Sequence, residues 1–414
     1  MNNAKNTKLF PYLERLLEGE AVEWKTLGEV AELYTGLSGK NKEHFKKGNA
    51  PYVTYKNIFE NLAVDSSILE MVRIEADERQ HSIKYGDILI TGSSENIEEV
   101  GMASVVTFHP ETGIYLNSFS FGIRFHPTVQ LSPEFTKYLF RSDLLRKQIM
   151  KTASGVTRFN VSKKKFSAIT IPIPPLRVQA RIVEILDKFT QLEAELEAEL
   201  EAELEARKKQ YAYYRDQLLN FSQCPPLNVN IEWKTLGEVC ENLDSQRRLI
   251  TSSKRKKGIY PYYGASGIVD FVESYIYEGD YLLVSEDGAN LLARNTPIAF
   301  SISGKNWVNN HAHVLKFDTY EGRKFVEYYL NHIDLEPYIS GAAQPKLNQN
   351  NLNSIPIPLP PLSEQRRIVD ILDRFDTLTN SISEGLPKEI ALRRKQYEYY
   401  RDALLSFPRA EVTA

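Results

Sequence analysis

The sequence has few cysteines and no long apolar segment, and each absence excludes a class of protein. Its 414 residues include two cysteines, Cys224 and Cys240. These are too few for a disulfide framework, so we expect a reducing, cytoplasmic environment. No run approaches the roughly 20 apolar residues that cross a bilayer, and residues 1–20 lack the apolar core of a secretory signal. The chain length predicts two to four domains.

Short motifs that mark common catalytic sites are also missing. The chain has no GxxxxGKS/T phosphate-binding loop, no HExxH zinc motif and no GxSxG nucleophile elbow. Its Pro-Pro pairs follow Ile173, Cys224 and Leu359, not the Asn or Asp of amino-methyltransferase motifs. His311 and His313 alternate as strand neighbours do, without a cluster of Cys or His around them. We therefore predict no metal site and no catalytic residues. An enzyme with an unrecognised site is the least favoured alternative.

The net charge of −3 conceals an uneven distribution. Seven glutamates occupy the odd positions from 193 to 205 in one low-complexity segment. Removing these seven from the 54 acidic residues leaves 47 against 51 basic ones, a balance of +4. Local charge governs binding to nucleic acid more than the total does. The composition therefore allows a DNA-binding surface without establishing one.

The chain contains an internal duplication with a period near 200 residues. The matching pairs are EWKTLGEV at 23–30 and 232–239, YLNSFSFGIRF at 115–125 with WVNNHAHVLKF at 307–317, QARIVEILDKFTQL at 179–192 with QRRIVDILDRFDTL at 365–378, and RKKQYAYYRDQLLNF at 207–221 with RRKQYEYYRDALLSF at 393–407. The offset falls from 209 to 186 through the globular part of each half and then stays constant. One scaffold that carries two different binding surfaces is the favoured interpretation, over simple duplication with drift.

Proline-rich segments separate each globular part from a helical part. Residues 171–176 (IPIPPL) and 355–362 (IPIPLPPL) should be extended, because proline disfavours helix around it. Leu-Glu-Ala-Glu repeats follow in the first half, with apolar residues at matching positions in the second. We predict two long antiparallel helices that form a coiled-coil spacer with pseudo-two-fold symmetry, interrupted at Gly385 and Pro387. The predicted packing residues are Leu192, Leu196, Leu200, Leu204, Leu378, Ile382, Leu386 and Ile390.

Each globular part mixes short strands with short helices. GDILITG at 86–92 and GDYLLVS at 279–285 predict buried strands, whereas FTKYLF at 135–140 and FVEYYL at 325–330 are typical of amphipathic helices. No βαβ rhythm is evident, so the predicted fold class is α/β in the mixed α+β sense. The predicted boundaries are 1–21 (N-terminal helical segment), 22–176 (first globular domain), 177–221 (central helical region), 222–362 (second globular domain) and 363–414 (C-terminal helical region).

Basic and amide side chains gather in matched segments. Residues 154–166 and 340–351 lie 186 positions apart, and each begins beside a glycine that permits a tight turn. Lys and Arg bind phosphates, and Arg, Asn and Gln can pair with guanine or adenine edges. For any single residue a solvated surface is the plainer explanation, so the matched placement carries the prediction. The predicted DNA-binding residues are Lys40, Lys42, Lys46, Lys47, Lys56, Asn57, Arg158, Asn160, Lys163, Lys164 and Lys165, and then Arg247, Arg248, Lys254, Arg255, Lys256, Lys257, Gln344, Lys346, Asn348 and Gln349.

The duplicated pattern resembles the DNA specificity subunits of type I restriction-modification systems over essentially the whole chain. The features that carry the resemblance are the repeated WKTLGEV starts, the proline linkers, the QxRIVxILDxF helices, the Leu-Glu-Ala-Glu spacer and the RxKQYxYYRDxLL ends. Singly these motifs are modest, but in this order, and twice, they are highly specific.

The resemblance implies a function and a set of partners. The regions 22–176 and 222–362 would be target-recognition domains, each binding one half of an asymmetric, bipartite site in double-stranded DNA. Two modification (methyltransferase) subunits would dock on the helical parts, and motor-nuclease restriction subunits would join them. S-adenosylmethionine, ATP and Mg²⁺ would bind those partners, with no cofactor on this non-catalytic chain. The alternative is a duplicated coiled-coil scaffold that binds proteins and lacks DNA specificity.

Overall fold

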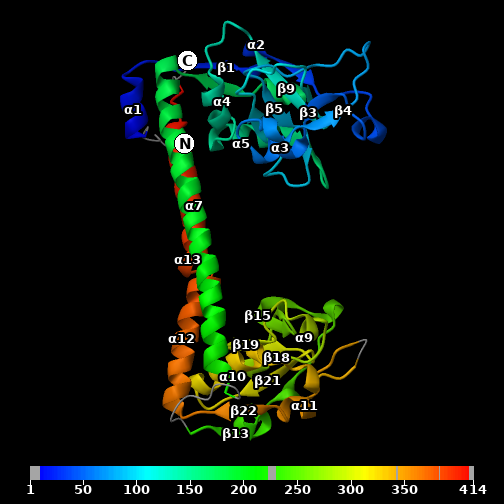
Figure 1. Ribbon diagram of the computed structural model, residues 1–414, viewed down its shortest axis with the longest axis vertical. Coiled ribbons are helices and arrows are strands. Elements are labelled where there is room, and N and C mark those ends of the chain that lie inside the picture. The colour runs from blue at the N-terminus through cyan, green and yellow to red at the C-terminus, as the bar shows by residue number, and fades with distance from the viewer. Residues whose placement is uncertain (1–9, 222–229, 342–343, 382, 410–414) are drawn as a thin grey trace. The chain divides into compact units, whose positions relative to one another are not determined.

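Figure 1 shows the computed structural model, which describes residues 10–221, 230–341, 344–381 and 383–409. Internal contacts divide the chain into two compact units. The first unit comprises the chain up to Ala198 together with the segment from Ala391 onward, and the second unit comprises Glu199–Ile390. Each unit therefore combines one globular part with helical segments from both halves of the duplication.

The first unit is built around a four-stranded antiparallel sheet. Its strands, in spatial order, are β2 (Ala31–Thr35), β9 (Ser120–Phe125), β5 (Ile88–Thr91) and β7 (Ala103–Val105). Every residue of β5 is buried, as expected of a short apolar run between turns. The predicted buried strand within residues 86–92 is therefore confirmed.

Smaller sheets and short helices complete this globular part. The other strands are β1 (Glu23–Thr26) paired with β12 (Thr170–Ile173), the sheet of β4 (Glu70–Val72), β3 (Ala50–Val53) and β8 (Tyr115–Leu116), and the sheet of β10 (Ala153–Ser154), β11 (Phe159–Val161) and β6 (Ser93–Ser94). The helices are α1 (Pro11–Leu17), α2 (Leu27–Val30), α3 (Tyr55–Glu60), α4 (Pro133–Leu139), α5 (Asp143–Thr152) and α6 (Lys163–Ser167), with 3-10 turns at Lys42–Phe45 and Ser66–Ile68. Helix α4 confirms the amphipathic helix expected near residues 135–140.

Residues from both ends of the chain share the core of the first unit. Leu404, Leu405 and Phe407 are buried in one cluster with Leu13 and Phe135. The rings of Phe135 and Phe407 are 6.1 Å apart in an edge-to-face arrangement. The globular part is thus completed by residues from the far end of the sequence, with Phe407 lying 272 positions after Phe135, which local patterns do not predict.

The second unit repeats the same framework. Its main sheet has the order β14 (Glu241–Asn242), β21 (Ala312–Lys316), β18 (Tyr281–Ser285) and β19 (Ala299–Ile302). The smaller sheets pair β13 (Glu232–Thr235) with β22 (Pro356–Leu359) and join β16 (Gly267–Val272), β15 (Lys257–Gly264), β20 (Lys305–Val308) and β17 (Tyr277–Glu278). All five residues of β18 are buried, which confirms the strand expected within 279–285.

Helices cover this second framework as well (Figure 1). They are α8 (Leu236–Val239), α9 (Asn290–Ala293), α10 (Tyr320–His332) and α11 (Gln349–Asn353), with 3-10 turns at Asp244–Gln246, Ser252–Lys254 and Glu336–Tyr338. Helix α10 contains the amphipathic segment predicted at 325–330. Its residues Phe325 and Val326 join a buried cluster with Leu219 and Phe221, the last residues of the first helical part.

The repeated octapeptide EWKTLGEV adopts the same local structure in both units. In each copy a short strand leads into a four-residue helix with a capping box. The carboxylate of Glu29 accepts from the backbone N–H of Thr26 at 2.7 Å, and Glu238 accepts from Thr235 at the same distance. These bonds satisfy donors that a helix start leaves without a partner.

The two helical parts differ in continuity. Helix α7 runs unbroken through Leu176–Leu219, whereas its counterpart is divided into α12 (Leu362–Asn380) and α13 (Gly385–Leu404). Gly385 has φ +75°, and a side chain there would come within 2.4 Å of the Thr377 carbonyl oxygen. Pro387 falls in the first turn of α13, where its missing N–H costs no bond. The interruption predicted at Gly385 and Pro387 is therefore confirmed.

Aromatic and hydroxyl side chains join the helices within each unit. In the first unit, Thr190 Oγ1 lies 2.8 Å from the hydroxyl oxygen of Tyr397, and the ring centroids of Phe189 and Tyr400 are 6.1 Å apart. Because residues 189 and 190 meet residues 400 and 397 respectively, α7 and α13 run antiparallel there, as predicted.

The second unit repeats the aromatic contact with different residues. The rings of Tyr211 and Tyr214 on α7 stack on Phe375 of α12 at 6.0 and 5.6 Å. The pair Tyr214 and Phe375 lies 186 positions from the pair Tyr400 and Phe189. Equivalent residues therefore meet in both units with the roles of the two helices exchanged, edge-to-face in the first unit and stacked in the second.

The predicted packing residues of the spacer, which we call the leucine stripe, are less buried than the sequence pattern predicts. Leu192 is 50% exposed, so it is not enclosed between helices as expected. Leu386 is buried, and Leu196, Leu200, Leu204, Leu378 and Ile390 are half-buried. Ile382 lies outside the described residues. Aromatic rings at positions 189, 211, 214, 375 and 400 also contact one another between the helices within each unit.

Candidate functional site

A small β-hairpin carries the candidate residues of the first unit. In this first hairpin (Ala153–Val161), Ser154 pairs with Asn160, and Asn160 pairs with Ser93 of β6, two residues after the main-sheet strand β5 ends. Gly155 has φ +148°, and a side chain there would lie 2.0 Å from the carbonyl oxygen of Arg158. Glycine is therefore required for this turn. The turn leaves Arg158 exposed, with its Nε donating to Ser93 Oγ at 3.1 Å.

The second unit contains a matching hairpin at the same place. In this second hairpin (Ser340–Leu347, of which residues 342–343 lie outside the described part of the chain), Ser340 pairs with Lys346, and Lys346 pairs with Asp287. Gly341 also has positive φ, +85°, and its turn also closes on a carbonyl oxygen, that of Gln344. Each hairpin residue lies 186 positions after its counterpart. Arg158 and Gln344 thus occupy equivalent positions in the two hairpins. Both side chains can make paired hydrogen bonds to bases.

A turn beside the first hairpin projects an aromatic ring. The side-chain oxygen of Asn117 accepts from the backbone N–H of Phe119 at 3.0 Å, and the Phe119 carbonyl accepts from the N–H of Gly92 at 2.8 Å. The Asn117 amide is buried and also donates to the carbonyl of Val53. The backbone is thereby fixed at Phe119 while the residue remains 66% exposed.

The second unit has the same turn with a different ring. The side-chain oxygen of Asn309 accepts from the N–H of His311 at 2.8 Å, and the His311 carbonyl accepts from the N–H of Glu286 at 2.9 Å. His311 Nδ1 lies 2.8 Å from the carboxylate of Asp287. Positions 119 and 311 are therefore structurally equivalent.

Two neighbouring hollows lie at the first hairpin and its turn. Their volumes are about 390 and 550 Å³, and both are lined by Tyr55 and Phe119. The first hollow also contains Arg158, and the second contains Lys42 and Lys56. A surface that combines an exposed aromatic ring with cations is suited to nucleic acid, since the cations bind phosphates and the ring contacts bases.

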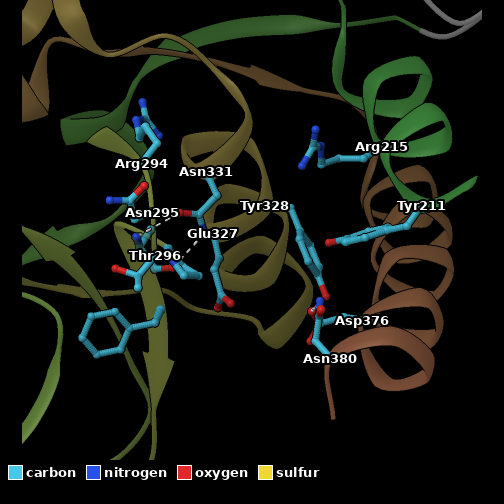
Figure 2. A pocket seen from close by; sticks show the side chains of 13 residues that line it. Tyr211, Arg215, Arg294, Asn295, Thr296, Glu327, Tyr328, Asn331, Asp376 and Asn380 are labelled. Carbon is cyan, nitrogen blue, oxygen red and sulfur yellow. Dashed lines mark hydrogen bonds between the residues drawn. The ribbon is translucent and has the colours of Figure 1, made fainter. Parts of the chain in front are cut away.

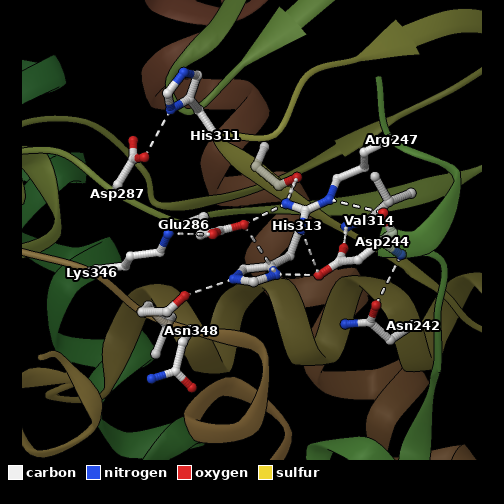
Figure 3. A network of polar contacts seen from close by, with 12 residues as sticks. Asn242, Asp244, Arg247, Glu286, Asp287, His311, His313, Val314, Lys346 and Asn348 are labelled. Atoms are coloured by element: carbon white, nitrogen blue, oxygen red, sulfur yellow. Dashed lines mark hydrogen bonds and ion pairs between the residues drawn. The ribbon is translucent and has the colours of Figure 1, made fainter. Parts of the chain in front are cut away.

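A buried polar cluster lies behind the second hairpin (Figure 3). His313 has no exposed surface. Its Nδ1 lies 2.5 Å from Asp244 Oδ2 and its Nε2 lies 2.7 Å from the carbonyl oxygen of Leu347 in the hairpin. A carboxylate oxygen and a carbonyl oxygen are both hydrogen-bond acceptors, so each ring nitrogen of His313 faces an acceptor. His313 thus links the main sheet to the second hairpin.

Two further cations neutralise this cluster. Glu286 is 2.5 Å from Nη1 of Arg247 and 3.0 Å from Nζ of Lys346, while Arg247 also lies 3.2 Å from Asp244. A buried carboxylate is costly unless it is paired in this way. The pairing holds Lys346, and with it the second hairpin, against the sheet.

The carboxyl groups of the cluster are stabilised in their ionised form. Burial raises the pKa of Asp244, but the hydrogen bond and charge of His313 outweigh it, so the net pKa lies below its ordinary value. Burial also raises the pKa of Glu286, but the hydrogen bonds from Arg247 and Lys346 lower it. The net pKa of Glu286 is below its ordinary value. Both groups are therefore ionised at neutral pH.

The same cluster contains the one group of three potential metal ligands found among the described residues. Ligand atoms of Asp244, Glu286 and His313 lie within 4.8 Å of one another. However, the carboxylates already bind Arg247 and Lys346, and a metal ion would have to displace both cations. The donor set is therefore better explained as a charge network than as a metal centre.

The first unit has uncharged residues where the second has this cluster. Strand pairing in the two main sheets shows which positions are equivalent in the two units. Thr35, Gly92 and Phe121 of the first unit are equivalent to Asp244, Glu286 and His313 of the second, in that order. Phe121 packs edge-to-face on Phe166 at 5.2 Å. One backbone framework thus holds an apolar contact in one unit and a charge network in the other.

Most of the predicted DNA-binding residues lie on the surface. In the first unit the exposed ones are Lys42, Lys46, Lys47, Lys56, Arg158, Asn160, Lys163, Lys164 and Lys165. In the second unit Arg248, Lys254, Lys256, Lys257, Gln344, Lys346 and Gln349 are exposed, while Arg255 and Asn348 are half-buried. Asn348 caps α11 by accepting from the N–H of Asn351. These residues remain predictions, and Lys46, Lys56, Lys256 and Lys346 each share their charge with a nearby carboxylate.

The structure argues against direct DNA contact by three of the predicted residues. The side chain of Lys40 is fully enclosed and paired with Glu78. Asn57 is buried. Its side-chain amide donates to the backbone carbonyl of Asp65 and accepts from the backbone N–H of the same residue. Arg247 belongs to the buried cluster. Each side chain is committed to the fold, because a buried polar group must find its partner within the protein.

Sequence analysis considered His311 only as a strand neighbour of His313 and did not single out Phe119. The repeat alignment already placed them opposite each other within 115–125 and 307–317, yet a search for cations and amides passes over a phenylalanine. What distinguishes these two residues is that each side chain reaches solvent within a mostly buried, aligned segment. Exposure is known only from the structure.

A hollow of about 360 Å³ also lies between α7, α10, α12 and β19 of the second unit (Figure 2). Its polar side chains are mostly paired with each other or with backbone. The carboxylate of Glu327 binds Lys324, the hydroxyl of Tyr328 donates to Asp373, and Arg294 donates to carbonyls at the end of α10. We assign no ligand to it. Within the described residues no helix is long and apolar enough to span a membrane.

Comparison with known proteins identifies the family. The family model for the type I restriction modification DNA specificity domain matches residues 20–206 and again 228–392. The specificity subunit of the Escherichia coli type I restriction enzyme EcoR124I/EcoR124II is 32% identical over 444 residues, covering 97% of this chain and 98% of its own. The specificity subunit of the Escherichia coli enzyme EcoprrI is 32% identical over 381 residues, covering 90% and 92%.

Solved structures support the same fold. A chain from a study of complex assembly and conformational transition of the type I R-M system has a TM-score of 0.65 at 20% identity, covering 94% of this chain and 99% of that one. The HsdS subunit from Thermoanaerobacter tengcongensis has a TM-score of 0.53 at 21% identity, covering 94% and 96%.

Proposed function

Because this chain belongs to the family of type I restriction-modification DNA specificity proteins, we propose that it is the subunit that reads an asymmetric, bipartite DNA site for both methylation and restriction. The observation that carries the proposal is the matched pair of hairpins. The two units share a framework in which Ser154 and Ser340 begin equivalent turns, yet they present different side chains at their tips. Two such surfaces on one chain are what a two-part, asymmetric target requires.

The first unit would read one half-site and the second unit the other. Arg158 is suited to guanine, whose O6 and N7 it can contact together, and Gln344 is suited to adenine. The exposed lysines at 163–165 follow the first hairpin directly and would bind backbone phosphates. The proposed recognition domains are residues 22–176 and 222–362, with helical regions at 177–221 and 363–414 and a helical segment at 1–21.

Helix α7 would act as the spacer that sets the gap between the half-sites. Its 44 residues correspond to roughly 66 Å at about 1.5 Å per residue. One Leu-Glu-Ala-Glu repeat adds about 6 Å, close to the rise of two base pairs of B-DNA at roughly 3.4 Å each.

The chemistry of modification and cleavage would reside in partner subunits. We propose that two methyltransferase subunits dock on the repeated helical parts and that motor-nuclease subunits join the complex. S-adenosylmethionine, ATP and Mg²⁺ would bind those partners, and this chain would contribute no catalytic group. The absence of catalytic motifs from the sequence supports this division of labour, which is expected to operate in the cytoplasm.

The central test is selection of bound fragments from a randomised duplex library. The full chain, co-expressed with its neighbouring methyltransferase subunit, should enrich two short fixed blocks separated by a constant random gap. Deleting Leu196–Glu199 should shorten that gap, and adding one more repeat should lengthen it, while both blocks keep their sequence. A gap that does not change in either variant contradicts the spacer role. No enrichment by a folded, assembled complex would favour the protein-scaffold alternative.

Salt dependence tests the phosphate contacts separately. Replacing Lys163, Lys164 and Lys165 by Ala should weaken binding to all sequences alike. It should also reduce the salt slope of binding by up to about one unit per lysine. A matched control is Lys234→Ala, since Lys234 lies on β13 beside Glu232 and belongs to neither hairpin. An unchanged slope in the triple variant would place these lysines outside the DNA contact.

A further inference from the structure

The exposed ring of Phe119 is not explained by the stability of the fold. Burying apolar surface stabilises a protein, yet this residue is 66% exposed. Its backbone is nevertheless held on both sides, by Asn117 through the N–H and by Gly92 through the carbonyl. A rigid turn that presents an apolar ring to solvent positions that ring for contact with something else.

The surroundings of Phe119 indicate what that partner is. The ring lines both hollows of the first unit, between Arg158 on one side and Lys42 and Lys56 on the other. Cations bind the phosphates of a DNA duplex. A ring that lies between such cations is therefore placed to contact the edges of the bases.

The second unit provides independent support, because it builds the same turn around another ring. His311 is held by Asn309 and Glu286 as Phe119 is held by Asn117 and Gly92. Figure 3 shows the His311 ring bonded to Asp287 and apart from the cluster around His313. In the described part of the chain, Nε2 of His311 makes no hydrogen bond, so this atom can bond to an external partner.

We propose that Phe119 and His311 are matched base-reading residues, an inference that rests on the proposed function. Phe119 contacts the 5-methyl group of a thymine in the first half-site, because a ring without donors or acceptors can distinguish bases in the major groove only through apolar contact. His311 exchanges a hydrogen bond through Nε2 with a polar base edge at the corresponding place in the second half-site. Asp287 orients the ring for this contact.

The experiment repeats library selection with Phe119→Ala and His311→Ala in the full chain with its methyltransferase subunits. Phe119→Ala should lower the base preference at one position of one half-site on the order of tenfold, as for the loss of one base contact, and His311→Ala should do so only in the other. The unaffected half-site in each variant shows that the complex is folded. Tyr85→Ala is the matched control, since Tyr85 is 44% exposed, packs on His109 and lines neither hollow.

Replacing thymine by deoxyuridine tests the contact at the level of one methyl group. At the position that depends on Phe119, this replacement should weaken binding by the wild-type chain about fourfold, the effect of one buried methyl group. Binding by Phe119→Ala should not change, and Phe119→Leu should retain part of the sensitivity.

The outcomes separate this inference from the proposed function. If the wild-type complex enriches a bipartite site and Phe119→Ala leaves every base preference unchanged, the assignment of Phe119 is overturned while the proposed function stands. Equal sensitivity of wild type and Phe119→Ala to deoxyuridine also overturns it. If the wild-type complex enriches no site, the proposed function itself fails.

Discussion

The two globular units share a backbone framework and differ in what the framework carries. Both have the same strand order, the same hairpin opened by a glycine and the same asparagine-anchored turn. At matched positions the first unit has Thr35, Gly92 and Phe121, and the second has Asp244, Glu286 and His313. Both hairpins are paired through backbone hydrogen bonds, and in the second unit the side chains of His313 and Glu286 add contacts that the first unit lacks.

The largest difference between the units is expected when His313 is replaced. His313→Phe supplies the residue of the first unit but leaves Asp244 without its closest partner and the Leu347 carbonyl without a donor. We expect it to lower the free energy of unfolding by about 3 kcal/mol, since removing one partner from a buried ion pair strands the other. Chemical denaturation followed by unit-resolved hydrogen exchange measures the effect.

The double variant Asp244→Thr/His313→Phe is the control for that prediction. It removes the stranded carboxylate and should be less destabilised than His313→Phe alone, because the two changes are coupled. If the single variant is as stable as wild type, the buried cluster does not support the second hairpin.

A smaller effect is expected at the hairpin tips. Arg158→Ala and Gln344→Ala should each relax base preference in one half-site by about 1–3 kcal/mol, without altering the other half-site. Lys164→Ala should instead weaken binding uniformly, because a phosphate contact carries no sequence information. Selection from a duplex library distinguishes the two patterns. Relaxation of both half-sites by Arg158→Ala would break the correspondence between units and half-sites.

The helical contacts provide a weaker comparison. Tyr397→Phe removes the hydrogen bond to Thr190 in the first unit and should cost about 1 kcal/mol of unfolding free energy. Tyr211→Phe, at the matching position, should cost little, since the described residues offer its hydroxyl no hydrogen bond and the ring still stacks on Phe375. Thermal denaturation of both variants tests the difference. Equal losses would mean that the hydroxyl contact does not contribute.

The smallest expected difference is the response to acid. Asp244 and Glu286 have pKa values below their ordinary values of 3.8 and 4.5 in the folded chain. Their stabilisation is present above those ordinary values and is lost as the pH falls from them through the lowered pKa values. Hydrogen exchange should therefore show the second hairpin loosening before the first below about pH 4. In Asp244→Asn this difference should shrink, and a first hairpin that loosens earlier would contradict the assignment.

Local sequence patterns predicted the strands and helices better than they predicted which residues those strands and helices pack against. The buried strands at 86–92 and 279–285, the amphipathic helices and the break at Gly385 follow from apolar periodicity and backbone restriction, which act over a few residues. The leucine stripe was less informative. A repeat of four indicates a helix, but Leu192 is half exposed, while Phe189 and Tyr400 nearby make a ring contact between the helices.

The candidate site could be predicted as segments and only partly as residues. The matched spacing of 154–166 and 340–351 placed both hairpins correctly, since equal offsets imply equal folds. Lys40, Asn57 and Arg247 were expected at the DNA surface from their chemical type alone. Their enclosure depends on Glu78, Asp65 and Glu286, partners that are distant in sequence.

The sequence by itself determined the duplication, the strand and helix content, the hairpin segments and the family, because each is encoded in spacing along the chain. Only the tertiary structure decided which charges face solvent and which neutralise one another. It also decided that residues 404–407 complete the first core and that Phe119 and His311 occupy one equivalent turn. These features depend on contacts between residues far apart in sequence, where burial and distance, rather than residue type, determine what a side chain can do.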